Sequence, residues 1–133
     1  MTTETGPRRL ISSGSPYEAA YGYSRAVVVG DGCWVAGTTD AGPDGHSTHP
    51  GDATGQARAA FGIGLAALAE AGFAAEDVVR VRMYIVRADD ARAVASVNGE
   101  LFDAIRPAAT LVRVAGLIDP SLLVEIELEA RRA

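Results

Sequence analysis

The chain has 133 residues, of which 48% are hydrophobic and 22% are charged, a composition typical of one folded domain and not of a disordered or fibrous chain. Its formal net charge of −5 disfavours a nucleic-acid partner bound through neutralised phosphates. All 12 basic residues are arginine, which excludes a Schiff-base lysine and lysine-anchored pyridoxal phosphate.

Three further features concern the cellular location. Cys33 is the single cysteine, so an internal disulfide is impossible. The first ten residues, MTTETGPRRL, lack the charged-then-apolar layout of a secretion signal, and the apolar runs are too short to cross a membrane. We therefore expect a cytoplasmic protein with neither a membrane nor a nucleic-acid partner.

The first third of the sequence predicts short strands and polar loops. Residues 1–7 are expected to form a loose terminus, and residues 8–12 a short strand. The stretch GSPYEAAYGYS, residues 14–24, is rich in Gly, Ser, Pro and Tyr and is expected to be a loop. Residues 25–29 and 33–37 flank the turn signal GDG and predict a hairpin.

A long polar loop, residues 38–52, follows this hairpin, and loops of that length are often functional. A helix is expected next, capped by Asp52 or Thr54 and ended by Gly72. Apolar side chains recur along it at helical spacing, at Ala57, Phe61, Leu65 and Leu68. Small residues form a second stripe that permits close approach to a sheet, at Ala60, Gly64, Ala67 and Ala71.

The last part of the chain predicts one more helix among three strands. Residues 78–86 alternate apolar and polar side chains, as a strand does. The second helix begins near residues 89–90 and stops before Pro107. Strands 109–114 and 123–130 finish the chain, and the second alternates apolar residues with glutamates. The order predicts one α+β domain, a mixed sheet with two helices packed on one face.

Arg113 interrupts the apolar stretch RPAATLVRV and needs a partner. We expect the Thr110 side of its strand to face the helices. If this strand pairs with strand 123–130, Arg113 then lies beside glutamates on the open face of the sheet. An open face that mixes apolar residues with charges is typical of a subunit interface.

The sequence resembles the RidA/YjgF family of imine and enamine deaminases along nearly its whole length. The resemblance is carried by GYSRAVVVGDGCWVAGTT (22–39), DVVRVRMYIVRADDARAVASVNGELF (77–102) and RPAATLVRVAGLIDPSLLVEIELEA (106–130). It implies a chorismate-mutase-like α+β fold, a homotrimer with a small-molecule cleft between neighbouring subunits, and hydrolysis of imines or enamines such as 2-aminoacrylate without metal or cofactor. The resemblance also implies that the deaminating members carry an arginine directly after Pro-Ala, which binds the carboxylate of the substrate.

Carried over residue by residue, the resemblance makes Glu125 the catalytic acid–base group and Tyr23 the residue that closes the cleft. Gly37 and Thr38 are expected beside the ligand, although Thr38 could equally serve a loop hydrogen bond. The clamp arginine is absent, because its place is Ala109. Leu111 is expected to line the vacated position.

Two arginines could compensate for the missing clamp. Arg113 lies four strand residues, about 13 Å, beyond Ala109, which is too far for simple substitution. Arg106 is close in sequence and stands just before Pro107. We therefore expect inefficient 2-aminoacrylate turnover and a larger or less anionic substrate.

Alternatives remain at this stage. The domain could be a non-catalytic, metabolite-binding or regulatory trimer, and a ribonuclease is disfavoured by the acidic charge. Glu125 could be a structural ion pair. His46 and His49 form an H-x-x-H pair in the polar loop, but no helix aligns them, so no metal site is expected.

Overall fold

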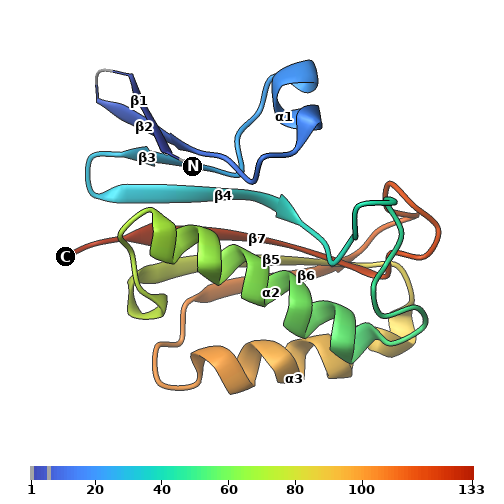
Figure 1. Ribbon diagram of the computed structural model, residues 1–133. Coiled ribbons are helices and arrows are strands. Elements are labelled where there is room, and N and C mark those ends of the chain that lie inside the picture. Colours follow the sequence, from blue (N-terminus) through green and yellow to red (C-terminus); the bar gives the residue numbers. More distant parts are fainter. Residues whose placement is uncertain (1, 6) are drawn as a thin grey trace.

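The computed structural model describes residues 2–5 and 7–133, which fold around a sheet ordered β1-β2-β3-β4-β7-β5-β6. The strands are β1 (Thr2–Thr5), β2 (Arg8–Ile11), β3 (Ala26–Val29), β4 (Gly32–Thr38), β5 (Val78–Ile85), β6 (Ala108–Arg113) and β7 (Val124–Arg131). Neighbours pair antiparallel except β5 and β6, which are parallel (Figure 1). The expected α+β class and mixed sheet are confirmed.

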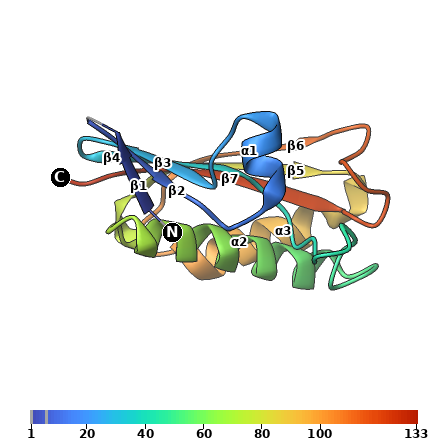
Figure 2. The same cartoon turned by 45° about the horizontal axis from the view of Figure 1, so that its top comes forward.

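Three helices accompany the sheet: α1 (Pro16–Tyr21), α2 (Ala53–Glu70) and α3 (Ala91–Phe102). Figure 2 shows α2 and α3 beneath one face of the sheet, as expected, and α1 on its other side. Short 3-10 turns, η1 (Ala75–Asp77) and η2 (Ala88–Asp90), precede β5 and α3. The open face is therefore walled at one end by α1.

The loop expected at residues 14–24 is wrong, because α1 forms there. Ser15 caps the helix by accepting a hydrogen bond from the Tyr17 amide, and Pro16 occupies the first helical turn. Gly22 ends it in the left-handed conformation with φ 74°. The Ser, Pro and Gly that indicated a loop are thus the start and stop signals of a short helix.

The terminus is also more ordered than expected. Within residues 1–7, Thr2–Thr5 form β1, which pairs antiparallel with β2 in the register Thr5↔Arg8. A sheet ladder joins backbone groups, and threonine favours extended backbone, so this polar segment can still add a strand.

The core lies between the sheet and the two long helices. On β7 one face is fully buried, through Val124, Ile126, Leu128 and Ala130. Phe61 of α2 and Phe102 of α3 meet edge-to-face at 5.8 Å between ring centroids. The alternation of β7 and the helical spacing of Phe61 and Phe102 therefore predicted these buried positions correctly.

The last two strands do not pair with each other, contrary to expectation. β6 lies at the sheet edge beside β5, in the register Met83↔Leu111 and Ile85↔Arg113, while β7 lies between β4 and β5. Because paired residues share a face, Leu111 and Arg113 lie on the side of the buried Met83 and Ile85.

The expected arginine–glutamate contact is therefore made by another arginine. Arg82 of β5 bonds Glu129 at 2.9 Å on the open face, whereas the Arg113 Nε donates to the Val86 carbonyl at 3.2 Å. Because β6 pairs in parallel with β5, Arg113 lies on the helix-covered side of the sheet. The expectation that it faces the open side is therefore wrong.

Two glycines of α2 give a matched test of how closely this helix approaches the sheet. A Cβ on Gly64 would lie 3.0 Å from Leu128 Cδ1 and 3.3 Å from Ile126 Cδ1, whereas one on Gly62 meets nothing within 4 Å. We expect Gly62→Ala to stabilise the protein by about 0.5–1 kcal/mol, since alanine favours helix. Gly64→Ala should destabilise it by about 1 kcal/mol or more, because both sheet residues are fully buried.

Urea denaturation of the two variants against the wild type measures these changes in unfolding free energy. Equal effects of the two substitutions would show that α2 does not depend on close contact at Gly64.

Candidate functional site

A bulge in β4 shapes the candidate site. Val35 pairs with Leu128 and Thr38 pairs with Ile126, so Ala36 and Gly37 together oppose the single residue Glu127. Bulges bend a strand and redirect side chains, and they are frequent beside active sites. Here the bulge brings backbone carbonyls and a bare glycine to the surface next to β7.

Glu125 of β7 lies directly over this glycine. A Cβ on Gly37 would stand 2.4 Å from Glu125 Oε2 and 3.2 Å from its Cδ, so any side chain at position 37 displaces the carboxylate. The resemblance placed both residues at a ligand, and the fold brings them into contact. The Glu125 carboxylate therefore occupies the space that a side chain at position 37 would need.

The two residues line a hollow of about 290 Å³ on the open face. Its walls come from the β4 bulge, β5, β7 and the segment before β7, through Gly37, Tyr84, Val114, Gly116, Leu117, Glu125 and Glu127. The Tyr84 hydroxyl donates a short hydrogen bond to Glu127 Oε1. The hollow thus contains two glutamates: Glu127, which is held by Tyr84, and Glu125, whose carboxylate lies against Gly37.

The electrostatics of Glu125 suit proton transfer. Burial raises the pKa of this carboxyl, and the neighbouring Glu127 raises it further, while the positive charge of Arg25 lowers it. A carboxyl whose pKa is displaced toward neutrality can accept a proton from water and return it to a leaving group. Perturbed acids in a concave site are candidates for such chemistry.

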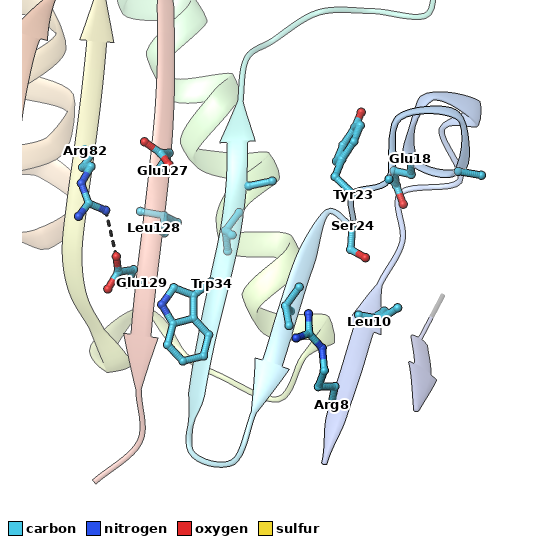
Figure 3. A pocket seen from close by; sticks show the side chains of 15 residues that line it. Arg8, Leu10, Glu18, Tyr23, Ser24, Trp34, Arg82, Glu127, Leu128 and Glu129 are labelled. Carbon is cyan, nitrogen blue, oxygen red and sulfur yellow. Dashed lines mark hydrogen bonds and ion pairs between the residues drawn. The ribbon is translucent and has the colours of Figure 1, made fainter. Parts of the chain in front are cut away.

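A second and larger hollow, about 610 Å³, lies beside the first on the same face. Figure 3 shows Tyr23 and Glu18 at its α1 end and Trp34, Arg82 and Glu129 along the sheet. Glu127 lines both hollows, so they share a wall. Tyr23 is 45% exposed and lines this larger hollow, but it is not among the residues that line the Glu125 hollow.

The remaining expected site residues lie elsewhere in the chain. Ala109 and Leu111 are on the edge strand β6, on the opposite side of the sheet from Glu125, and Leu111 packs partly against the core. Thr38 is buried and its hydroxyl donates to the Ala36 carbonyl at 2.7 Å, so it serves the bulge. Within one chain, Ala109 and Leu111 therefore do not line the Glu125 hollow.

Arg106, considered as a compensating arginine, follows the end of α3. Its φ is 56°, and its amide donates to the Phe102 carbonyl at 2.7 Å, which closes the helix. The Arg106 backbone thus ends the helix, and this role does not bring the Arg106 guanidinium to Glu125. Neither Arg106 nor Arg113 lines the Glu125 hollow.

The polar loop expected to be functional is held by side-chain hydrogen bonds. Its two histidines bond different carboxylates: His46 Nδ1 lies 3.1 Å from Asp119 Oδ1, and His49 Nδ1 lies 3.1 Å from Asp40 Oδ2. Asp40 is buried and also accepts from Ser47 Oγ at 2.9 Å. Within the described residues, no group of three His, Cys, Asp or Glu side chains is placed to hold a metal ion.

The His46–Asp119 pair predicts a pH-dependent contribution to stability. The hydrogen bond to Asp119 raises the pKa of His46, while the Ser121 and His46 contacts lower the pKa of Asp119 to about 2. The contact that raises the pKa of His46 contributes its full stabilisation below pH 6.5, the ordinary histidine pKa. This stabilisation is lost as the pH rises through the pKa of His46 in the folded protein. Asp119 stays ionised throughout this window.

We therefore expect His46→Gln to lower the melting temperature more at about pH 5.5 than at about pH 8.5. Calorimetry of both proteins at the two pH values measures the difference. A larger loss at the higher pH would contradict an ionic contact between His46 and Asp119.

Sequence reasoning missed three residues around Glu125, namely Arg25, Tyr84 and Glu127. Arg25 was counted only as the start of a strand, yet its Nη2 donates at 2.7 Å to both the Ala36 and the Gly37 carbonyls. An arginine directly before the apolar run AVVV was the available signal.

The geometry defines an α+β domain with a glutamate-bearing hollow on the open face of its sheet. Residues 14–132 match the family described as Endoribonuclease L-PSP. The chain therefore belongs to this family, which is also known as the YjgF/RidA family. The family assignment made from sequence motifs is thereby confirmed.

Individual relatives agree with this assignment. An uncharacterized protein of Streptomyces coelicolor is 42% identical over 132 residues, covering 99% of this chain and 96% of that protein. A YjgF/YER057c/UK114-family structure from Mycobacterium tuberculosis has a TM-score of 0.84 and 42% identity, covering 94% of this chain and 99% of that one. A Pseudomonas aeruginosa structure of unknown function has a TM-score of 0.80 and 31% identity, over 98% and 94% of the two chains.

The family is one of small-molecule-binding proteins, and the hollow at Glu125 has a size suited to such ligands. In the part of the chain that the structure describes, no helix is both long and apolar enough to span a bilayer.

Proposed function

We propose that this protein is a cofactor-free hydrolase or tautomerase acting on a small imine, enamine or related carbon–nitrogen compound. The observation that carries the proposal is the Glu125 carboxylate held over Gly37 in a hollow of about 290 Å³, with burial raising the pKa of Glu125. A carboxylate so placed can take a proton from water as the water adds to the C=N carbon. Returning that proton to nitrogen gives a carbinolamine. The same carboxylate can then move the hydroxyl proton of the carbinolamine to its nitrogen, so that the C–N bond breaks and ammonia leaves with the carbonyl product formed.

The proposed substrate is larger or less anionic than 2-aminoacrylate. Ala109 stands where deaminating relatives are expected to carry a carboxylate-binding arginine, and Arg106 and Arg113 are both outside the Glu125 hollow. Arg25 does not replace the clamp, because its Nη2 is directed to two backbone carbonyls. Binding must then depend on uncharged contacts.

We further propose a homotrimer in which a neighbouring subunit completes the ligand cleft. The open face exposes apolar side chains beside the Arg82–Glu129 ion pair, including Trp34 at 39% and Val112 at 41% exposure. The edge strand β6 also carries Ala109 away from Glu125 within one chain, so a cleft containing both residues needs a second copy. Sedimentation equilibrium should give a mass of three chains.

The cytoplasm is the proposed location, since the free thiol of Cys33 is buried and needs no oxidising compartment. A ribonuclease activity is not part of the proposal, because the net charge of −5 opposes binding to phosphate backbones.

A ligand screen followed by a turnover assay tests the proposed function. We expect thermal stabilisation by neutral imines or amides to exceed that by ketoacids, and ammonia release from at least one imine. Release from 2-aminoacrylate, generated in place, should be much slower. Specific binding without ammonia release from any bound imine, and without its isomerisation, would instead favour a non-catalytic, metabolite-sensing trimer.

A further inference from the structure

Arg25 stands at the entry to β3 and bonds the β4 bulge from the side. Its Nη2 donates to the carbonyls of Ala36 and Gly37, both at 2.7 Å, and its own carbonyl accepts from the Ala36 amide at 2.9 Å. These two bulge residues are the pair that oppose a single residue of β7. One guanidinium therefore satisfies the carbonyls that the bulge turns away from the sheet ladder.

The same bulge determines where the Glu125 carboxylate can lie. Glu125 Oε2 occupies the position that a Cβ on Gly37 would need, so the Gly37 backbone is its immediate neighbour. Arg25 holds the Gly37 carbonyl, and the positive charge of Arg25 interacts favourably with Glu125. Gly37 thus connects the guanidinium to the carboxylate through a single peptide unit.

Arg25 also interacts with the α1 side of the open face. The carboxylate of Glu18 on α1 is another favourable electrostatic partner, and Glu18 is itself held by the Ser13 amide at 3.0 Å. The Arg25 Nε is buried and has no hydrogen-bond partner among the described residues. The side chain is thus half-buried with its Nη2 directed at backbone carbonyls, which distinguishes it from a clamp open to ligand.

We propose that Arg25 is the positioning residue of the site: its guanidinium fixes the β4 bulge beneath the Glu125 carboxylate. It acts through Gly37 and Glu125 and does not touch the substrate. The inference builds on the proposed role of Glu125, but it concerns a property that exists without any substrate.

The opposing influences on Glu125 make this role measurable. Burial and Glu127 raise the pKa of Glu125, and Arg25 is the group that lowers it. Removing the Arg25 guanidinium should therefore raise the pKa of Glu125. A base with a higher pKa is ionised over a narrower range, so the acid limb of a pH–rate profile should move the same way.

The experiment is a pH titration of carbon-13-labelled glutamate carboxyls by NMR, with the Glu125 signal assigned by its loss in Glu125→Gln. The midpoint should be higher in Arg25→Gln than in the wild type, and Arg25→Lys, which keeps the charge, should lie between them. The matched control is Arg58→Gln, which removes an exposed arginine of α2 that pairs with Glu100. An unchanged midpoint in folded Arg25→Gln, or an equal shift in Arg58→Gln, would overturn the proposal.

A second measurement needs only the wild type and Glu125→Gln, should the Arg25 variants fail to fold. The guanidinium nitrogen-15 signals of Arg25 should inflect at the midpoint of Glu125, and the inflection should vanish in Glu125→Gln. Its absence from the wild type would refute the coupling. Coupling without turnover would contradict the proposed function alone, whereas turnover without coupling would contradict only the role of Arg25.

Discussion

Replacement of Glu125 by glutamine is expected to lower turnover of the imine substrate by about 10²–10⁴-fold, the usual contribution of a positioned acid–base group. Glutamine has nearly the same shape, so the hollow beside Gly37 keeps its form and ligand affinity should change only a few-fold. The loss therefore falls on the chemical step, and steady-state kinetics with a direct binding measurement separates the two effects.

Two further variants make this result interpretable. Gly37→Ala should reduce turnover independently, because the new Cβ would stand 2.4 Å from Glu125 Oε2 and push the carboxylate away. Its effect on folding should be small, because that oxygen ends a flexible side chain. Glu100→Gln removes an exposed glutamate of α3 and should leave turnover unchanged. Full activity of Glu125→Gln would assign Glu125 a structural role only.

Replacement of Gln56 is expected to have the largest effect on stability. This α2 side chain is fully buried and bonds three backbone groups: its Nε2 donates to the His49 carbonyl at 3.2 Å and the Ser121 carbonyl at 3.0 Å, and its Oε1 accepts from the Leu123 amide at 2.8 Å. Gln56→Ala leaves these groups without partners and opens a cavity. We expect a loss of roughly 3–4 kcal/mol in unfolding free energy.

Gln56→Met separates the contribution of the hydrogen bonds to this loss of stability from the contribution of packing. Methionine keeps most of the side-chain volume but supplies no hydrogen bonds to the polar loop or to the start of β7. Urea denaturation should show that it is nearly as destabilising as alanine. If methionine restores wild-type stability, packing rather than hydrogen bonding holds these segments together.

Strong periodicity made most of the fold predictable. The alternating strand β7 has a single way to bury its apolar face, and β5 follows the same alternation from Val81 to Ile85. The edge strand β6 has no such constraint, because neither of its faces is fully buried and its residues are exposed or half-buried. Its alternation therefore fitted either face, and only the parallel register with β5 placed Arg113 correctly.

The site was predictable where a motif marked it and not where the fold assembled it. Glu125 and Gly37 were expected from family motifs, and the structure shows them in contact. Arg25 is separated from Glu125 by 100 positions in the sequence. Its proposed role depends on the β4 bulge, which no pattern in the sequence predicted. The arginine that stood out in the sequence, Arg113, lies on the other side of the sheet, whereas the one beside Glu125 was inconspicuous.

The most direct test of the account compares pyruvate with its neutral amide, pyruvamide, in a titration followed by backbone amide NMR. A site centred on Gly37 and Glu125 without an exposed guanidinium should bind the amide more tightly, with saturable shifts at Gly37. Tighter binding of pyruvate, with its shifts centred on Ala109, would contradict the account.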